Sequence, residues 1–336
     1  MPKKDFISVI VSVKNEEKYI NDCLISLIDQ SLSKDLYQVV VVDGLSTDLT
    51  RDIVQEYIYK YPNFIKMYVN EKEWQAAGRN IAIRNETSSN LVAYIDGHCI
   101  ADREWLKILY DDLKSNLHSD VAGIGSDHFS PQDEPVIGRA IDQVFRSSFG
   151  GQGSSYKHVS AVSEVITAPY VLYKKSALCD VGLYDEDLKI GEDFALNYKL
   201  RRAGYRLIRD PKAIVYYYKK RSFSAFSKQM YNYGMAKAII AKKYPGSISF
   251  LHYMPPLLLI IILITICLAI LNQNLDYFIY IIIFTYLLLL FVFSIKAGIN
   301  ERESKISLFM ICLFALQHFF YSLGFIIGIF KQGWCL

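Results

Sequence analysis

The sequence predicts an α/β domain with an open, mostly parallel sheet, followed by a C-terminal block of transmembrane helices. Two observations carry this prediction. Short β-branched runs alternate with helix-like segments over residues 1–130, which is typical of a parallel sheet covered by helices on both faces. Three uncharged, apolar stretches then follow near the end of the 336-residue chain. Each is long enough, or nearly so, to cross a hydrocarbon core of about 30 Å as a helix.

The alternating elements are assigned from apolar periodicity and from helix-start residues. Strands are expected at Phe6–Val13, Tyr37–Val42, Phe64–Val69, Leu91–Ile95 and Val121–Ile124. Helices are expected at Glu16–Asp29, Leu49–Tyr59, Gln75–Asn85 and Asp102–Asn116. Residues 130–160 are polar and irregular, and we expect either a substrate-covering loop or an ordinary surface loop there. Helix and strand signals resume from residue 174 to residue 218.

The apolar tail predicts three transmembrane helices, at about 254–271, 277–295 and 307–330. A buried soluble helix would explain any one of these runs, but three in succession favour a membrane domain. We therefore expect a first domain at residues 1–250 and a membrane domain at residues 251–336.

The loops between the apolar runs differ in charge. The loop 272–276 has no Lys or Arg, whereas the loop 296–305 contains Lys296, Arg302 and Lys305. The positive-inside rule places the second loop in the cytoplasm, so residues 1–250 are expected there too, on a multi-pass protein of the cell membrane. The basic N-terminus is followed by a short alternating run, which indicates a strand and no signal peptide.

The overall charge argues against nucleic-acid binding, because the formal net charge is only +3. The stretch 199–243 is an exception, with thirteen Lys or Arg residues and the single acid Asp210. It suits anionic lipid headgroups or a polyanionic substrate. The six cysteines show no metal-ligand spacing, which is typical of a reducing compartment.

The strongest local signal for chemistry is the segment Tyr94-Ile95-Asp96-Gly97-His98. An acid ends an apolar strand, and a second potential ligand follows two residues later, where the chain turns. A carboxylate together with diphosphate oxygens suits Mg²⁺ or Mn²⁺, and an imidazole favours Mn²⁺ slightly. The alternative is that Asp96 and His98 only satisfy backbone groups of the loop.

Two further acidic signals follow strand ends or precede helices. Asp43 ends the second strand and can accept hydrogen bonds from a ribose or a base, although ordinary turn chemistry explains it equally well. Glu192 and Asp193 stand at a helix start, where the helix dipole favours acids. One of these two carboxylates could instead be a general base for an acceptor hydroxyl.

These signals, in this order, resemble the family 2 glycosyltransferases of the GT-A fold over roughly residues 6–240. The resemblance includes the segments VSVKNEE at 11–17, VDGLSTDLT at 42–50, AAGRNIAI at 76–83, YIDGH at 94–98 and VGLYDEDLKIGEDFALNYKLRRAGYR at 181–206. Together with the apolar tail, these segments look most like membrane-anchored bacterial exopolysaccharide glucosyltransferases of the succinoglycan type.

The resemblance implies a role for each matching residue. Asp193 would be the catalytic base with Glu192 beside it, and Asp96 would bind a divalent metal, Mn²⁺ or Mg²⁺, with His98 replacing the second acid of the usual DxD. The nucleotide sugar would be bound by these residues: Asn15, Glu17, Asp43, Arg79, Asn80, Asp96 and Arg221. Lys219 or Lys220 would assist Arg221 in neutralising the leaving diphosphate.

The expected reaction is the inverting transfer of one sugar from a nucleotide-diphosphate sugar, with UDP as the expected nucleotide, to a lipid-linked saccharide in exopolysaccharide or cell-surface glycan synthesis. Processive synthases carry Gln-x-x-Arg-Trp after the base, whereas Gln229 here is followed by Met-Tyr-Asn-Tyr, which argues against a polymerase. The alternatives are a polyprenyl-phosphate glycosyltransferase and a non-catalytic nucleotide-sugar-binding membrane protein. Expected partners are the donor, the acceptor, membrane lipid and other glycan-assembly membrane proteins.

Overall fold

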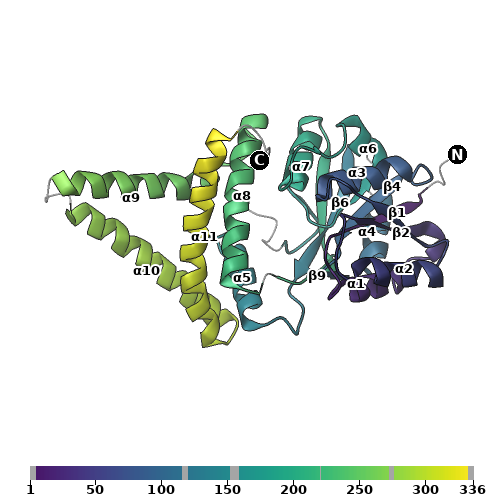
Figure 1. Ribbon diagram of the computed structural model, residues 1–336, viewed down its shortest axis with the longest axis horizontal. Coiled ribbons are helices and arrows are strands. Elements are labelled where there is room, and N and C mark those ends of the chain that lie inside the picture. Colours follow the sequence, from purple (N-terminus) through teal and green to yellow (C-terminus); the bar gives the residue numbers. More distant parts are fainter. Residues whose placement is uncertain (1–4, 116–119, 152–158, 220, 272–275, 332–336) are drawn as a thin grey trace. The chain divides into compact units, whose positions relative to one another are not determined.

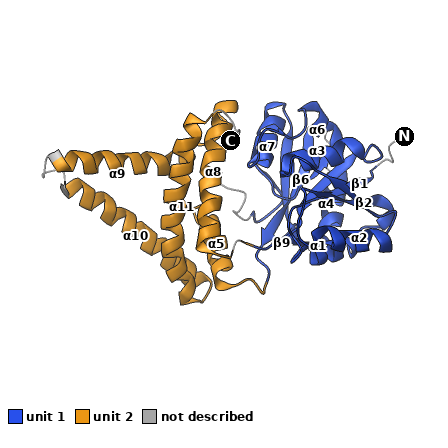
Figure 2. Ribbon diagram, in the orientation of Figure 1, with its two compact units in different colours: residues 1–131, 158–218 blue, residues 132–157, 219–336 orange. Residues whose placement is uncertain are grey.

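The computed structural model describes residues 5–115, 120–151, 159–219, 221–271 and 276–331 (Figure 1). The chain divides into two compact units (Figure 2). Unit 1 comprises residues 1–131 and 158–218, and unit 2 comprises residues 132–157 and 219–336. The expected boundary at residue 250 does not coincide with this division, because the helix Phe223–Lys243 packs against the C-terminal helix Ser304–Phe330.

Unit 1 is built on a nine-stranded sheet with the order β3-β2-β1-β4-β8-β6-β9-β5, and β7 pairs with β9. Its strands are β1 Ile7–Val13, β2 Tyr37–Asp43, β3 Ile65–Val69, β4 Leu91–Asp96, β5 Cys99–Ala101, β6 Val121–Phe129, β7 Ser163–Glu164, β8 Leu172–Lys174 and β9 Arg206–Tyr217. The four strands β3-β2-β1-β4 are parallel, as the alternation predicts. Beyond β4 the sheet is mixed, because β8 runs antiparallel to both β4 and β6.

The helices of unit 1 cover this sheet. They are α1 Ile20–Ile28, α2 Thr50–Lys60, α3 Gln75–Asn85, α4 Trp105–Ser115, α6 Lys175–Asp180 and α7 Glu192–Arg202, with a short 3₁₀ turn at Lys34–Leu36. The helix expected from residue 16 begins only at Ile20, because Asn15 has a left-handed backbone (φ 56°) and the chain turns there. The helix α3 packs on β1 and β2, and α4 packs on β6, β8 and β9.

Strand register brings the acidic signals to one edge of the sheet. The central strand β1 pairs with β2 on one side and with β4 on the other. Val13 lies opposite Asp43, and Ser12 lies opposite Asp96. Both aspartates therefore flank the carboxyl end of β1, where open α/β sheets bind their ligands.

Unit 2 is helical. Its elements are α5 Val136–Arg146, α8 Phe223–Lys243, a 3₁₀ turn at Phe250–His252, α9 Met254–Leu271, α10 Asp276–Asn300 and α11 Ser304–Phe330. The expectation of an irregular segment at 130–160 is wrong for its first half, because α5 occupies residues 136–146. The apolar residues Ile137, Ile141 and Val144 recur there at helical spacing. The Gly/Ser-rich residues 152–158 lie outside the described part of the chain.

The helix α11 packs closely against α8. A Cβ on Gly234 would lie 2.0 Å from the carbonyl oxygen of Tyr321, and a Cβ on Gly324 would lie 1.9 Å from that of Tyr231. The backbones of the two helices therefore approach where only glycine fits, which is common between membrane helices.

Two of the described helices are long and apolar enough to cross a membrane. They span Tyr277–Asn300, with a mean hydropathy of 2.7, and Ser304–Phe330, with a mean hydropathy of 1.8. The third expected span is also helical, but it is shorter, at Met254–Ile270. The loop expected at 272–276 falls almost entirely outside the described residues. The other expected loop is reduced to the turn between α10 and α11.

Candidate active site

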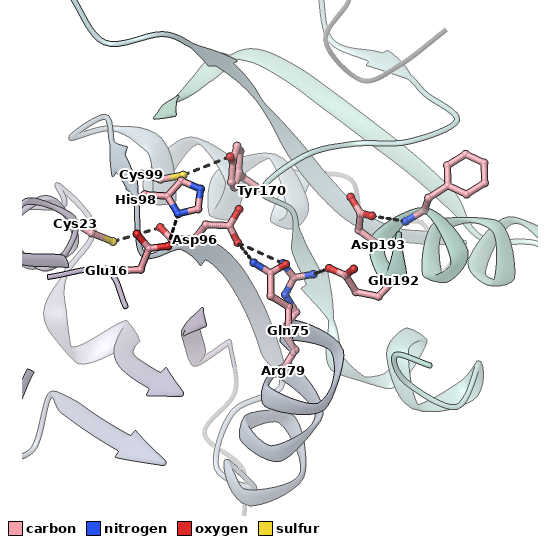
Figure 3. A network of polar contacts seen from close by, with 11 residues as sticks. Glu16, Cys23, Gln75, Arg79, Asp96, His98, Cys99, Tyr170, Glu192 and Asp193 are labelled. Atoms are coloured by element: carbon pink, nitrogen blue, oxygen red, sulfur yellow. Dashed lines mark hydrogen bonds and ion pairs between the residues drawn. The ribbon is translucent and has the colours of Figure 1, made fainter. Parts of the chain in front are cut away.

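The turn after β4 forms the centre of the candidate site (Figure 3). The Asp96 side chain is 17% exposed, and its Oδ1 accepts a hydrogen bond of 3.0 Å from Nε2 of Gln75, the first residue of α3. Nη2 of Arg79, one helical turn later, lies 3.5 Å from the same oxygen. Asp96 is thus held by two donors from α3, which fix its direction at the edge of the sheet.

His98 lies on the same turn. Its Nδ1 is 2.8 Å from Oε1 of Glu16, a residue of the loop after β1. The ring also contacts the aromatic rings of Tyr217 and Tyr19, with centroids 5.1 Å and 6.5 Å away. The carbonyl oxygen of His98 accepts the backbone N–H of Tyr218 at 3.3 Å. Both the ring and the backbone of His98 are therefore fixed by neighbouring elements.

Arg79 connects the β4 turn to the start of α7. Its buried guanidinium donates to Oε1 of Glu192 at 2.9 Å and lies 3.5 Å from Asp96 (Figure 3). It also lies over the rings of Tyr94 and Tyr184, at 4.2 Å and 5.3 Å from their centroids, in cation–π geometry. These contacts hold the Arg79 guanidinium in one position, where it links Asp96 to Glu192.

The acid pair at the start of α7 consists of two residues in different environments. Glu192 is buried, whereas Asp193 is half-buried and its Oδ1 accepts the backbone N–H of Phe194 at 2.7 Å. Burial raises the pKa of Glu192 to about 7 in spite of the Arg79 cation, and the charges of Asp193 and Asp96 add to the rise. The preceding Gly191 has φ 80°, a left-handed conformation that favours glycine.

Asp43 is enclosed, with no exposed surface. Its carboxylate accepts the backbone N–H of Ser46 at 3.2 Å and lies 3.4 Å from Nε of Arg51. Asn15 and Glu17 accept the backbone N–H groups of Thr47 and Leu49, at 2.8 Å and 3.1 Å. These three of the predicted nucleotide-binding residues therefore organise the loop that follows β2.

Asn80 is occupied by a neighbouring loop. Its Nδ2 donates to the carbonyl oxygen of Tyr184 and to Oε1 of Glu186, and its Oδ1 accepts the N–H of Tyr184. Glu186 is bound in addition by Lys72 and Arg84. The role of Asn80 in this structure is thus to anchor residues 184–186.

The basic residues after β9 belong to unit 2. Nε of Arg221 lies 3.4 Å from the buried Oε1 of Glu134, and Arg221 keeps 40% of its side chain exposed. Lys219 is buried with its Nζ 3.0 Å from Asp142, so a bound diphosphate could not use it without breaking that pair. Lys220 lies outside the described residues.

The donor set of the β4 turn fits a divalent ion bound mainly by its substrate. Among the described residues no group of three or more His, Cys, Asp or Glu side chains could hold a metal. Burial raises the pKa of the nearby thiols of Cys23 and Cys99, which disfavours the thiolate form that binds metals. Asp96 and His98 would then be the two protein ligands, since Mg²⁺ or Mn²⁺ commonly takes its other ligands from phosphates and water.

Two residues that hold the site did not stand out in the sequence. Glu16 is part of the segment after β1, beside the Asn15 and Glu17 that were singled out, and Gln75 stands one helical turn before Arg79. The parallel pairing of β1 with β4 could have pointed to Glu16, because it brings the two following loops together.

The chain matches known proteins over most of unit 1. The family model described as Glycosyl transferase family 2 matches residues 8–178. A Methanococcus voltae protein named dolichyl N-acetyl-alpha-D-glucosaminyl phosphate 3-beta-D-2,3-diacetamido-2,3-dideoxy-beta-D-glucuronosyltransferase is 30% identical over 245 residues, which is 71% of this chain and 75% of that protein. The succinoglycan biosynthesis protein ExoA of Rhizobium meliloti is 28% identical over 232 residues, 68% of each chain.

Solved structures share the fold. The mannosyltransferase PcManGT from Pyrobaculum calidifontis, solved with GDP-Man and Mn²⁺, superposes with a TM-score of 0.61 at 18% identity and covers 93% of this chain and 86% of that chain. The predicted GT-A fold is thereby confirmed. On the family match and the relatives, the chain belongs to glycosyltransferase family 2 and is a glycosyltransferase.

Proposed function

We propose that this enzyme transfers one sugar, with inversion, from a UDP-sugar to a lipid-linked saccharide in exopolysaccharide or cell-surface glycan synthesis. One observation carries the proposal. The buried guanidinium of Arg79 joins Asp96, the predicted diphosphate-side ligand, to the acid pair at the start of α7. A donor held at Asp96 and an acceptor hydroxyl near Asp193 would therefore meet at one end of the sheet.

Residues at the carboxyl ends of β1, β2 and β4 hold the donor. Asp96 and His98 would bind a divalent ion, which when present stabilises the negative charge of the leaving nucleoside diphosphate. Asn15, Glu17 and Asp43 shape the loop after β2 against which the nucleoside would lie. Arg221 is assigned to the diphosphate by the resemblance alone, and within unit 2 it pairs with Glu134.

The acceptor is activated by Asp193. This carboxylate is half-buried, whereas Glu192 is buried and committed to Arg79, so Asp193 is the member of the pair that can reach a bound hydroxyl. It accepts the hydroxyl proton as the oxygen attacks the anomeric carbon. Glu192 keeps Arg79 in place and thereby supports both ends of the site.

The acceptor class rests on the relatives and on the apolar helices. The name of the Methanococcus voltae relative specifies a dolichyl-linked sugar phosphate as acceptor, and that of the Rhizobium meliloti relative specifies succinoglycan biosynthesis. An acceptor saccharide has a hydroxyl proton for Asp193 to remove, whereas a polyprenyl phosphate has none at neutral pH. We therefore prefer the lipid-linked saccharide, with the enzyme anchored in the cell membrane by its C-terminal helices and unit 1 in the cytoplasm.

The deciding experiment is Asp193→Asn. Asn retains the shape and the backbone hydrogen bond but cannot accept a proton, and general-base assistance is worth about 10²–10⁴-fold in rate. We expect transfer from UDP-sugars to extracted lipid-linked acceptors to fall by at least about a hundredfold. Donor affinity should stay within about a factor of two of the native value. The unfolding temperature should change by roughly a few degrees at most, as is usual for surface substitutions.

Glu192→Gln is the matched comparison, and it should lose less transfer because it supports the site through Arg79. Near-normal turnover in Asp193→Asn would favour the polyprenyl-phosphate acceptor instead. Absence of any transfer or donor hydrolysis in the native enzyme, with donor binding intact, would favour the non-catalytic binding protein.

A further inference from the structure

Glu16 faces one nitrogen of the predicted metal ligand His98. Its Oε1 lies 2.8 Å from Nδ1, and both side chains are largely buried, with 19% and 17% exposed (Figure 3). The rings of Tyr19 and Tyr217 flank the imidazole. The other ring nitrogen, Nε2, is therefore the one that can face a ligand at the β4 turn.

Several contacts hold Glu16 in this position. Its backbone N–H donates to Oγ1 of Thr50 at 2.8 Å, and its carbonyl oxygen accepts the N–H groups of Tyr19 and Ile20 at 2.9 Å each. The turn of β4 makes room for its side chain, since a Cβ on Gly97 would lie 3.3 Å from Cγ of Glu16. The carboxylate thus arrives at the imidazole from a fixed backbone.

This arrangement determines which nitrogen of a neutral His98 carries the proton. A carboxylate accepts hydrogen bonds, so the proton belongs on Nδ1 and the lone pair on Nε2. Metal-bound histidines almost always donate the N–H of their second ring nitrogen to such an outer partner, which orients the ring and makes it a more basic ligand.

We propose that Glu16 is a positioning residue that fixes His98 as an Nε2 ligand and gives the site its preference for Mn²⁺ over Mg²⁺. The proposal rests on the function proposed above, in which Asp96 and His98 share one ion. Imidazole suits transition metals such as Mn²⁺ better than it suits Mg²⁺, which prefers oxygen. The Glu16 contact therefore affects the Mn²⁺ site more than the Mg²⁺ site, because it acts through the imidazole alone.

The test measures metal binding to the purified full chain in detergent with UDP present, and does not depend on transfer. Mn²⁺ affinity is followed by electron paramagnetic resonance, and Mg²⁺ affinity by competition. In Glu16→Ala we expect Mn²⁺ affinity to fall about 10–100-fold, the usual effect of removing an outer partner of a ligand. Mg²⁺ affinity should fall less, so that the Mn²⁺/Mg²⁺ ratio decreases.

Glu16→Gln is the conservative variant, because the amide oxygen of Gln can still accept a hydrogen bond from the Nδ1–H of His98. It should retain more of the Mn²⁺ affinity than Glu16→Ala. Glu73→Gln is the matched control, since it removes an exposed carboxylate paired with Lys14 and should leave the ratio unchanged. Nitrogen-15 spectra of labelled histidine should show a proton on Nδ1 of His98 in the native enzyme, even if Glu16→Ala fails to fold.

Each outcome separates the two proposals. Equal losses for both metals, an unchanged ratio in Glu16→Ala, or a proton on Nε2 of native His98 would overturn the role of Glu16 alone. Mn²⁺ binding that persists unchanged in Asp96→Asn would instead refute the metal site, and with it this inference. Loss of the metal in Asp96→Asn but normal transfer in that variant would contradict only the proposed function.

Discussion

Two strands of unit 1 end at the same dipeptide, Asp-Gly, but the two aspartates have different environments. Asp43 is the last residue of β2 and Asp96 is the last residue of β4, each is followed by a glycine, and the two strands lie on either side of β1. The Asp43 carboxylate is enclosed by Ser46 and Arg51, whereas Asp96 is partly exposed beside Gln75 and Arg79. A strand-end aspartate can therefore be enclosed by the loop that follows it or stay partly exposed, and the donors around it decide which.

The largest expected difference between the two ends is in transfer rate. Asp96→Asn should lower transfer by at least about 10³-fold, because it removes the charge that would hold the ion and the diphosphate. Asp43→Asn should lower kcat less than about tenfold, and its effect should appear mainly as a higher KM for the donor. A residue that only shapes the binding loop stabilises the bound donor and the transition state equally, and the loss of such binding raises KM. Steady-state kinetics of the two purified variants decide this. Equal losses in kcat would show that Asp43 contacts the reacting donor directly.

The two glycines sharpen the comparison through stability. A Cβ on Gly44 would lie 2.7 Å from the backbone oxygen of Glu73, which cannot rotate away. A Cβ on Gly97 would meet the side chains of Val13 and Glu16 instead. We expect Gly44→Ala to lower the free energy of unfolding by about 1–3 kcal/mol, the usual cost of overpacking. Gly97→Ala should cost less stability and mainly weaken Mn²⁺ binding, since it displaces Glu16. Denaturant unfolding and metal titration of both variants would test this, and the reverse order would contradict it.

The last expected effect concerns pH and the Glu192 end of the site. Burial raises the pKa of Glu192 to about 7 in the folded chain, against an ordinary value of 4.5. Between these two pH values the folded state holds a proton that the unfolded state has lost. The protonated Glu192 carboxyl therefore contributes stability that is fully present below about pH 4.5 and is lost as the pH rises through about 7. The stability of the native enzyme relative to Glu192→Gln should therefore decrease from pH 5 to pH 8.

Unfolding temperatures of both proteins across that range provide the measurement. Asp112, whose burial raises its pKa to about 7, titrates in the same window, so only the difference between native enzyme and variant isolates Glu192. Parallel curves would mean that Arg79 keeps Glu192 ionised throughout.

Much of the site could be predicted because its residues stand at ends of regular elements. The β-branched runs located β1, β2 and β4 to within one residue at one end, and the apolar periodicity located α3 with the same bounds as in the structure. The parallel order of β3-β2-β1-β4 then placed Asp43 and Asp96 at one edge. The helix α5 was missed because the polar residues around it and the glycine-rich residues after it made the whole segment resemble a loop, although its apolar residues recur at helical spacing.

The sequence by itself determined the fold, the family and the strand-end acids, because local periodicity and short motifs record which residues end each element. Only the tertiary structure decided which acids are enclosed and which stay partly exposed, since this depends on donors far away in the chain. Glu16 and His98 are 82 residues apart, and Arg79 and Glu192 are 113 residues apart. Such contacts form only when parallel strands pair and α3 packs across them, and no local pattern encodes their distances.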